Sequence, residues 1–586
     1  MHTDNLFRAV REHAQSIGDR TAIVFLPDGP GSAIRTELTY GGLDLQARRI
    51  ATWLQERRTS GDRVLLLYPP GTTFVEAFFG CLYAGMIPVP APLPGSDGKA
   101  GRLQAIMRAA GCTALLTDEA NLAEITEQLD EVAGTAIVAT DTAALADVDG
   151  WREPVITPDT LALLQFTSGS TSDPRGVMVS HASLWHNLGL IEQTFALTRG
   201  ARVATWLPHY HDMGLIGGPL TSLYLGGTLS LMSPMSFLRE PFRWLDLIDQ
   251  HGVEISPAPN FAYDLCVRRV KPERVEQLDL SRWRHALNGA EPVDPATLRR
   301  FERHFAPAGL KPSSMRPCYG MAEVGLLVTG TEEHQRPRPV RVDAAGVERR
   351  QFIRTDAEEG SRDLVSSGPV PAGFDLRIVD PGTRSVLADG RIGEIWLRGP
   401  SVARGYWGRP DETAAVFEAY TSLDEGPFLR TGDLGVCHEG DLYITGRIKE
   451  LIIVNGRNIY PQDLERRLSL LHPALADGAS AAFGVPGQGA ERIVVVQEIR
   501  TAGAAAPTDL QELADLVKTD LSEYGGTPVA NVCFVKRGAV LRTTSGKVRR
   551  TTMRELFLGN ALQAHFEDLE PSIKKLHRAT DQLAGV

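Results

Sequence analysis

Cysteine is scarce in this chain. The 586 residues contain six cysteines, scattered at positions 81, 112, 266, 318, 437 and 533 without a Cys-x-x-Cys spacing. This pattern argues against a zinc site or a disulfide framework and fits a reducing compartment. Long runs of Lys or Arg are lacking too, and 72 acidic residues outnumber 61 basic ones. An acidic chain without such runs is a poor candidate for binding nucleic acid or an anionic membrane.

A long apolar run fit to cross a membrane is also lacking. Residues 213–238 carry no charge, but five glycines and two prolines make them a poor transmembrane helix. We expect a buried strand, turn and helix there instead. The N-terminus, MHTDNLFRAVREHAQ, is typical of an amphipathic helix with acids and bases, not of a secretory signal. We therefore expect a cytoplasmic protein without stable membrane insertion.

The chain does contain a regular alternation of short apolar runs and helix-like stretches. The run at 63–68 precedes a helix expected at 72–84, and the run at 114–117 precedes one expected at 118–133. Apolar strands between helices predict sheets covered on both faces, hence an α/β fold. With 43% hydrophobic residues, a chain of this length can form two or more domains with sizeable cores.

A second αβ pattern begins past residue 450, with enough residues for a small separate domain. Its expected elements are a helix at 461–471, strands near 479–485 and 491–500, a helix at 508–523 and a strand at 529–535. We place the domain boundary near residue 447. Ahead of it, residues 331–365 are polar and rich in charge, which predicts an insertion with little core of its own.

Residues 165–181, QFTSGSTSDPRGVMVSH, contain the most informative loop. Five small residues, Thr167, Ser168, Gly169, Ser170 and Thr171, lie between two apolar runs. A strand, a loop rich in hydroxyls and glycine, and a second strand suit the close approach of a backbone to a polyphosphate. No Gly-Lys-Ser/Thr closes the loop, which excludes a Walker A motif. A plain surface turn is the alternative.

Five further motifs place polar residues after apolar runs. They read WLPHYHDMG at 206–214, NGAEP at 288–292, CYGMAE at 318–323, TGDLG at 431–435 leading into DLYITGRIK at 441–449, and LRTTSGKVRR at 541–550. Together with the loop, they resemble the adenylate-forming superfamily of acyl-CoA synthetases, luciferases and nonribosomal peptide adenylation domains, over about residues 10–555. Three features are similar to the fatty acyl-AMP ligase branch: YHDMGL at 210–215, the insertion at 331–365, and NGRNIYPQDLE at 455–465.

This resemblance implies a fold and a reaction. The α/β fold would comprise a large N-terminal domain at 1–447, built of α/β subdomains with a distorted barrel, and a small mobile α+β domain at 448–586. A fatty acid and ATP, with Mg²⁺, would give an acyl-adenylate and pyrophosphate. The acyl group would then pass to the phosphopantetheine thiol of a holo acyl carrier protein.

The resemblance also assigns nucleotide contacts. Residues 167–171 and Gly176 would hold the β- and γ-phosphates, with Arg175 where the superfamily usually has lysine. Tyr319 would stack on adenine, Asp433 would accept hydrogen bonds from the ribose hydroxyls, and Arg447 would reach the ribose or the α-phosphate. The other implied nucleotide contacts are Gly289, Ala290, Glu291, Gly320 and Met321.

Catalysis, by the same resemblance, involves Lys547, Glu323 and His211. Lys547 would neutralise the charge that develops between carboxylate and α-phosphate. Glu323, with Thr167, would bind Mg²⁺, and His211 would contact the fatty-acid carboxylate or gate its pocket. Plainer interpretations exist for each residue type: a solvated lysine, a salt-bridged glutamate, a buried histidine, a core tyrosine or a turn aspartate.

Other functions remain open from the sequence. A fatty acyl-CoA synthetase would use the same first-step residues with CoA as acceptor, although an insertion that restricts the small domain would favour stopping at the adenylate. An amino-acid-activating domain needs an aspartate for the substrate amine, and Asp212 is out of register for that role. A silent adenylate-binding scaffold is disfavoured because Glu323, Asp433 and Lys547 are all present.

Overall fold

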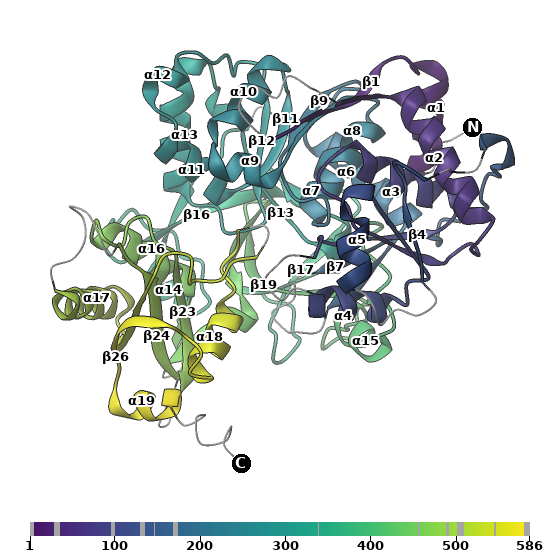
Figure 1. The fold of residues 1–586 in the computed structure, drawn as a ribbon. Helices are drawn as coiled ribbons and strands as arrows, with labels where there is room; N and C mark the ends of the chain where they lie inside the picture. The colour runs from purple at the N-terminus through teal and green to yellow at the C-terminus, as the bar shows by residue number, and fades with distance from the viewer. Residues whose placement is uncertain are drawn as a thin grey trace.

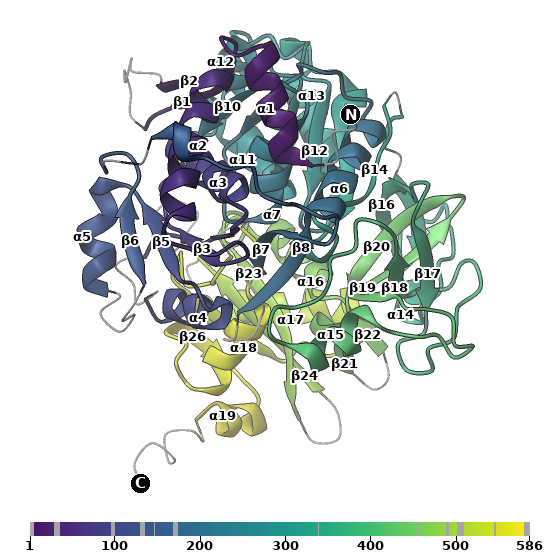
Figure 2. The same cartoon turned by 90° about the vertical axis from the view of Figure 1, so that its right-hand side faces the viewer.

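The chain folds into a large part and a small part. The structure, a computed structural model, describes residues 5–28, 36–94, 100–128, 135–143, 145, 147–167, 174–333, 335–337, 339–454, 457–487, 491–500, 509–543 and 546–578. In Figure 1 the large part runs from purple to green, and the yellow-green to yellow elements gather at the lower left. Helix α1 (Leu6–Ser16) and helix α19 (Pro571–Arg578) lie at opposite ends of the molecule in both views (Figures 1 and 2).

The largest sheet has eight strands in the order β14-β13-β12-β11-β9-β10-β1-β2. Its inner pairs are parallel, and the edge strands β2 and β14 run antiparallel to their neighbours. The strands are β1 (Thr21–Leu26), β2 (Thr36–Thr39), β9 (Arg202–Thr205), β10 (Thr228–Met232), β11 (Ile255–Pro259), β12 (His285–Gly289), β13 (Met315–Gly320) and β14 (Leu327–Gly330). Because the carboxyl ends of parallel strands meet at one edge, the motifs that follow β12 and β13 come together there.

Aromatic side chains pack one layer of helices together beside this sheet. Trp244 of α10 packs 5.2 Å from Trp283, and Tyr263 of α11 packs 5.0 Å from Phe301 of α13, measured between ring centroids. The helices on this side are α10 (Phe242–Gln250), α11 (Asn260–Arg269), α12 (Pro272–Val275) and α13 (Pro295–Phe305), which Figure 1 shows side by side. Burial of such large rings contributes much of the stabilising free energy of a core.

A second sheet is parallel throughout and has the order β4-β3-β5-β6. Helix α3 (Thr72–Ala84) coincides with the helix predicted at 72–84, and β5 (Ala114–Thr117) with the strand predicted at 114–117. Helix α3 ends at Gly85, whose φ of 75° is favourable for glycine. The other elements here are α2 (Tyr40–Gln55), β3 (Arg63–Leu66), β4 (Ile87–Pro90), α4 (Ala100–Ala110), α5 (Glu119–Gln128) and β6 (Ala136–Ala139).

Where a distorted barrel was expected, the structure has a third sheet of six strands in the order β15-β16-β20-β19-β18-β17. Its strands are β15 (Pro339–Asp343), β16 (Ser361–Pro369), β17 (Asp375–Val379), β18 (Gly393–Arg398), β19 (Leu429–His438) and β20 (Asp441–Arg447), followed by a short turn of helix at Ile448–Glu450. Helix α15 (Pro410–Phe417) lies against β19. The α/β fold class is thus confirmed.

The insertion has more core than predicted. Residues 331–365 supply β15, helix α14 (Ala344–Glu348) and the start of β16. Val342, Val347 and Leu364 are buried in one cluster with Leu434 and Tyr443 of the neighbouring strands. The prediction of little core was wrong because a few apolar residues, widely spaced among charges, share one face of the hairpin.

The small part is built on a four-stranded sheet with the order β23-β24-β25-β26. Helix α16 (Pro461–Leu471) coincides with the helix predicted at 461–471, and proline at its first position suits a helix start. The remaining elements are β21 (Ile452–Val454), β22 (Arg457–Ile459), β23 (Ser480–Pro486), β24 (Glu491–Glu498), α17 (Leu510–Gly525), β25 (Asn531–Val535), α18 (Arg550–Leu558) and β26 (Ala564–Asp568). Two of its buried clusters draw all their residues from the chain after residue 450.

The strand, turn and helix predicted for the uncharged segment 213–238 occur only in its second half, as β10 and α9 (Pro234–Arg239), and the helical turns ahead of them were not predicted. These turns are α7 (Asp212–Leu215), a π-helical turn at Ile216–Leu220 that contains Pro219, and α8 (Thr221–Tyr224). The wider π-turn accommodates the proline within a helix. No helix within the described residues is long and apolar enough to cross a membrane.

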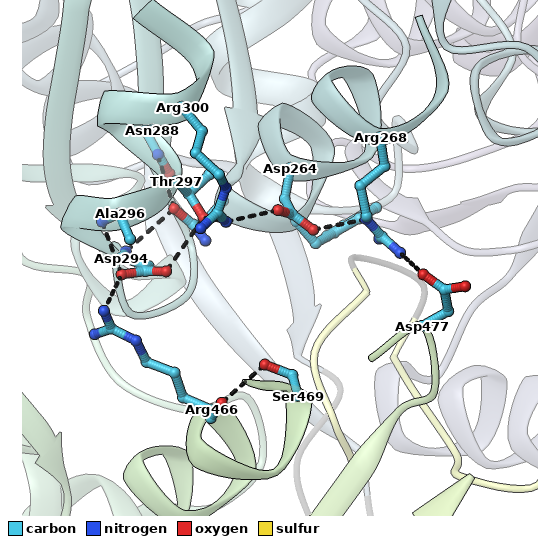
Figure 3. A network of polar contacts seen from close by, with 12 residues as sticks. Asp264, Arg268, Asn288, Asp294, Ala296, Thr297, Arg300, Arg466, Ser469 and Asp477 are labelled. Carbon is cyan, nitrogen blue, oxygen red and sulfur yellow. Dashed lines mark hydrogen bonds and ion pairs between the residues drawn. The ribbon is translucent and has the colours of Figure 1, made fainter. Parts of the chain in front are cut away.

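Polar contacts join the two parts across α11, α13 and α16 (Figure 3). Arg466 of α16 forms an ion pair with Asp294, which caps α13, at 3.0 Å between Nη2 and Oδ1. Arg268 of α11 lies 3.7 Å from Asp477 and also contacts Asp264 at 2.9 Å. These contacts are among those that join the small part to the large one in this structure.

Candidate active site

A cavity of about 570 Å³ opens at the carboxyl edge of the eight-stranded sheet. Its wall is built from the ends of β7 (Leu161–Thr167), β12 and β13, from β19 and β20, and from the loop that carries Lys547. Most of the predicted site residues lie in this wall: Thr167, His211, Gly289, Ala290, Tyr319, Gly320, Met321, Glu323, Arg447 and Lys547. Motifs separated by hundreds of residues in the sequence thus face one space.

The predicted phosphate loop joins β7 to β8 (Arg175–Ser180). Ser168, Gly169, Ser170 and Thr171 lie outside the described residues. Thr167 and Arg175, which pair across the hairpin, both line the cavity. Gly176 does not line the cavity. Packing explains the glycine there, because a Cβ would lie 2.9 Å from Cζ of Phe166. Both ends of the loop therefore reach the cavity.

Two of the predicted nucleotide contacts lie behind the wall. Glu291 accepts a hydrogen bond from the backbone N–H of Phe261 at 2.6 Å, so it serves the N-terminal turn of α11, and burial raises its pKa. Asp433 is buried beneath Thr431 and Gly432, which do line the cavity. The nucleotide roles of both residues stay predictions.

Asp433 and Arg447 face each other because β19 and β20 pair them directly in antiparallel register. Oδ1 of Asp433 accepts from Nε of Arg447 at 2.7 Å, and Oδ2 accepts from the Tyr319 hydroxyl at 2.8 Å. Asp433 raises the pKa of Arg447, whereas burial raises the pKa of Tyr319. One carboxylate thus connects the predicted adenine, ribose and phosphate contacts.

Glu323 lies in a short turn of helix (Ala322–Val324) after β13. The hydroxyl of Tyr406 donates to its Oε1 at 2.8 Å, and burial raises the pKa of the carboxyl. Among the described residues, no three His, Cys, Asp or Glu side chains form a metal-binding cluster. Magnesium, however, often takes one or two protein oxygens and completes its shell with phosphates and water. A single carboxylate that shares a wall with Thr167 fits such an ion.

Lys547 reaches the cavity from the small part. Its backbone N–H donates to Oγ1 of Thr543 at 3.1 Å, and its carbonyl accepts from the N–H of Thr543 at 2.7 Å. Burial and the nearby Arg447 lower the pKa of Lys547, while Asp212, Asp433 and Glu291 oppose that shift. The predicted catalytic lysine is therefore brought to the same space as the predicted nucleotide contacts.

His211 lies at the start of α7 with its Nδ1 at 2.7 Å from Oδ1 of Asp212. Burial acts to raise the pKa of Asp212, but His211 and Lys547 together lower it. His209 does not line the cavity: it packs 4.0 Å from the Phe74 ring, and burial lowers its pKa to about 3. Only the second histidine of the motif is placed to meet a substrate.

Sequence reasoning missed Asp212 and Tyr406 as parts of this site. Asp212 has a local signal, since it follows His211 directly and adjoins the uncharged segment. Tyr406 has none, because 83 residues separate it from Glu323.

Comparison with known proteins agrees with this geometry. The family described as AMP-binding enzyme matches residues 10–407. The medium-chain fatty acid–acyl-carrier-protein ligase JamA of Moorena producens is 39% identical over 563 residues, which are 94% of this chain and 94% of that protein. A long-chain fatty acid–AMP ligase of Mycobacterium marinum is 36% identical, with 94% of this chain and 96% of its own length covered.

Solved structures agree as well. A fatty acid AMP ligase from Legionella pneumophila has a TM-score of 0.75 at 36% identity, covering 97% of this chain and 98% of its own. A structure from studies of the fatty acyl-adenylate ligases of E. coli and L. pneumophila has a TM-score of 0.85 at 30% identity, covering 94% and 97%. The family predicted from the motifs is confirmed: the chain belongs to the AMP-binding enzymes and, within them, to the fatty acyl-AMP ligases.

Proposed function

We propose that this protein activates a fatty acid with ATP to form an acyl-adenylate and then transfers the acyl group to the phosphopantetheine thiol of an acyl carrier protein. The observation that carries the proposal is the single cavity shared by Thr167, Tyr319, Glu323, Arg447 and Lys547. The relatives support the substrate class, because JamA is named a fatty acid–acyl-carrier-protein ligase. The L. pneumophila fatty acyl-adenylate ligase was solved with acyl adenylate and pyrophosphate.

ATP would lie along the wall from β13 to the loop after β7. Adenine would contact Tyr319 and the backbone at Gly289 and Ala290, and the ribose hydroxyls would reach Asp433. The triphosphate would extend toward Thr167 and Arg175. Glu323 and Thr167 would hold Mg²⁺, which neutralises phosphate charge when bound.

In the first step, a carboxylate oxygen of the fatty acid attacks the α-phosphorus. The bond from that phosphorus to the bridging oxygen breaks, and pyrophosphate leaves with the electron pair. No proton needs to move, so the protein contributes position and charge. Lys547 and Arg447 would lie where negative charge increases in the transition state, and fixed cations in a site shielded from water stabilise such charge strongly.

An apolar arm of the cavity suits the acyl chain. Its walls are Ile191, Phe195, Ile255, Leu287, Leu326 and Leu327. Ile191 lies in α6 (His181–Thr194), and Phe195 directly follows that helix. The arm therefore lies between α6 and the large sheet. His211 lines the same cavity and would orient the carboxylate.

The second step needs Lys547 to leave, so that a thiol can reach the acyl carbonyl. We propose a boundary at residue 447, with the small domain turning about Lys449. The separate cores after residue 450 support independent movement. The insertion would oppose it, since the Glu348 carboxylate binds Nη2 of Arg457 at 2.6 Å and the Glu348 carbonyl accepts from Asn458 at 2.7 Å. That restraint favours stopping at the adenylate, and the name of JamA supports a carrier protein as the acceptor.

The contacts in Figure 3 give one prediction. Arg466→Ala removes the ion pair with Asp294 and should slow adenylation about 1.4- to 5-fold, because a partly exposed pair contributes roughly 0.2–1 kcal/mol. Thioester formation from preformed acyl-AMP should not slow. Arg467→Ala is the matched control, since Arg467 lies on the same helix but pairs with Asp520 inside the small part. Equal adenylation rates in the two variants would contradict a role for this contact.

The first half-reaction is tested by fatty-acid-dependent exchange of labelled pyrophosphate into ATP. We expect exchange with fatty acids, Mg²⁺ and ATP, and none when the acid is omitted. Exchange driven by amino acids instead of fatty acids would overturn the proposed substrate class.

A further inference from the structure

We infer that Tyr406 is a positioning residue for Glu323. Its hydroxyl holds the carboxylate in the orientation that a metal–nucleotide complex requires and ties it to the phosphate loop. The inference rests on the proposed function, in which Glu323 meets the metal that accompanies ATP. Nothing in the motifs used to predict the site points to this tyrosine.

Tyr406 and its neighbour Ala403 form two hydrogen bonds with Glu323. The Tyr406 hydroxyl donates to Oε1 of Glu323 at 2.8 Å, and the backbone N–H of Ala403 donates to the Glu323 carbonyl at 2.9 Å. Tyr406 is only 4% exposed and, like Glu323, lines the cavity. The rotation of the carboxylate and the path of its backbone are thus set by one short segment, residues 403–406.

The same segment is bonded to the strand that leaves the phosphate loop. The N–H of Met178 in β8 donates to the Gly405 carbonyl at 2.9 Å, and the N–H of Arg404 donates back to the Met178 carbonyl at 3.0 Å. The N–H of Trp407 donates to the Gly176 carbonyl at 2.8 Å. Tyr406 therefore fixes the carboxylate relative to the loop that would hold the phosphates.

The tyrosine itself has little freedom to move. Its ring packs edge-on against Phe417 with centroids 5.1 Å apart, and its backbone N–H donates to Oγ1 of Thr413 at 3.0 Å. On another side, the guanidinium of Arg175 lies 5.5 Å from the ring centroid, with its Nε at 2.7 Å from Oε2 of Glu412. The ring thus stands between the predicted metal ligand and the arginine at the end of the phosphate loop.

Such support should matter for a small, hard cation. Magnesium demands near-ideal octahedral geometry, so a ligand free to rotate binds it less well. Groups that orient a metal ligand typically change metal affinity about 10- to 100-fold when removed. Tyr406→Phe deletes one oxygen and keeps the ring packed on Phe417, which makes it the sharpest test.

The test measures binding without turnover. Mn²⁺ replaces Mg²⁺, α,β-methylene-ATP replaces ATP, and the affinity of the pair is measured by calorimetry and by the Mn²⁺ spin-resonance signal. We expect Tyr406→Phe to weaken Mn²⁺ binding in the presence of the analogue about tenfold or more. Tyr40→Phe is the matched control, because its hydroxyl also makes one buried hydrogen bond, to the Gly227 carbonyl at 2.8 Å, outside the cavity.

A double-mutant cycle separates the positioning of Glu323 from a general loss of structure in the binding site. If Tyr406 acts through Glu323, Tyr406→Phe should weaken binding no further in a Glu323→Gln background. In pyrophosphate exchange, Tyr406→Phe should raise the Mg²⁺ concentration for half-maximal rate and largely recover at saturating Mg²⁺. Wild-type affinity in Tyr406→Phe, or an equal loss in the Glu323→Gln background, would overturn the inference. A wild-type protein that binds the pair but fails to adenylate would instead refute the proposed function.

Discussion

Lys547→Ala should slow acyl-adenylate formation about 10²–10³-fold, the usual cost of removing one preorganised charge or donor at a transition state. The effect should fall on the rate at saturating ATP, because Lys547 meets charge that appears only as the carboxylate attacks. Burial and Arg447 lower the pKa of Lys547, while Asp212, Asp433 and Glu291 oppose that shift. Pyrophosphate exchange measures the first step alone.

Two comparisons make the Lys547 result specific. Thioester formation from preformed acyl-AMP should survive, because that step needs the lysine out of the way. Lys536→Ala, an exposed lysine just after β25 in the same part of the chain, should adenylate at the wild-type rate. Full exchange activity in Lys547→Ala would exclude the charge-neutralising role.

Asp433→Ala should lower kcat/KM for ATP about 10²-fold, because two hydrogen bonds to a charged group together contribute roughly 3 kcal/mol. The KM for the fatty acid should change much less. The control is Asp441→Asn on the adjacent strand, whose carboxylate accepts from Ser366 at 2.7 Å and does not line the cavity. An unchanged KM for ATP would remove Asp433 from the ribose site.

The same variant should alter the pH dependence of adenylation. Asp433 raises the pKa of Lys547, whereas Arg447 lowers it. Without Asp433, less negative charge offsets the effect of Arg447 on Lys547, so the pKa of Lys547 falls. Because the protonated lysine is the active form, activity is present below its pKa and lost above it. The alkaline limb of the rate profile should therefore move to lower pH in Asp433→Ala, and a move to higher pH would contradict this account.

Local signals explain where sequence reasoning succeeded. The helix at 72–84 is followed by Gly85, and the helix at 461–471 begins at Pro461, so each has a clear boundary signal. The motifs at the ends of β12 and β13 were brought together by the family resemblance, and the structure supplies the reason, since parallel strands end at one edge. The sequence therefore predicted which side chains face the cavity better than it predicted how they are held.

The failures share a physical cause, which is contact over long sequence distance. Segment 213–238 has the glycines and prolines of a turn, yet burial against the sheet holds Pro219 in a π-turn. The nucleotide role of Glu291 stays a prediction, but no local pattern indicates the hydrogen bond that its carboxylate accepts from Phe261 at the start of α11. The hydrogen bond from Tyr406 to Glu323 joins residues 83 positions apart, and no local sequence pattern predicts it.

The most direct test of the central claim is the fate of the acyl-adenylate. The protein is incubated with ATP, Mg²⁺ and fatty acids of several lengths, first without acceptor, then with CoA, then with a holo acyl carrier protein. We predict that acyl-AMP accumulates without acceptor, persists with CoA, and is consumed as acyl-carrier protein forms. Rapid formation of acyl-CoA would contradict the proposal and identify the protein as an acyl-CoA synthetase.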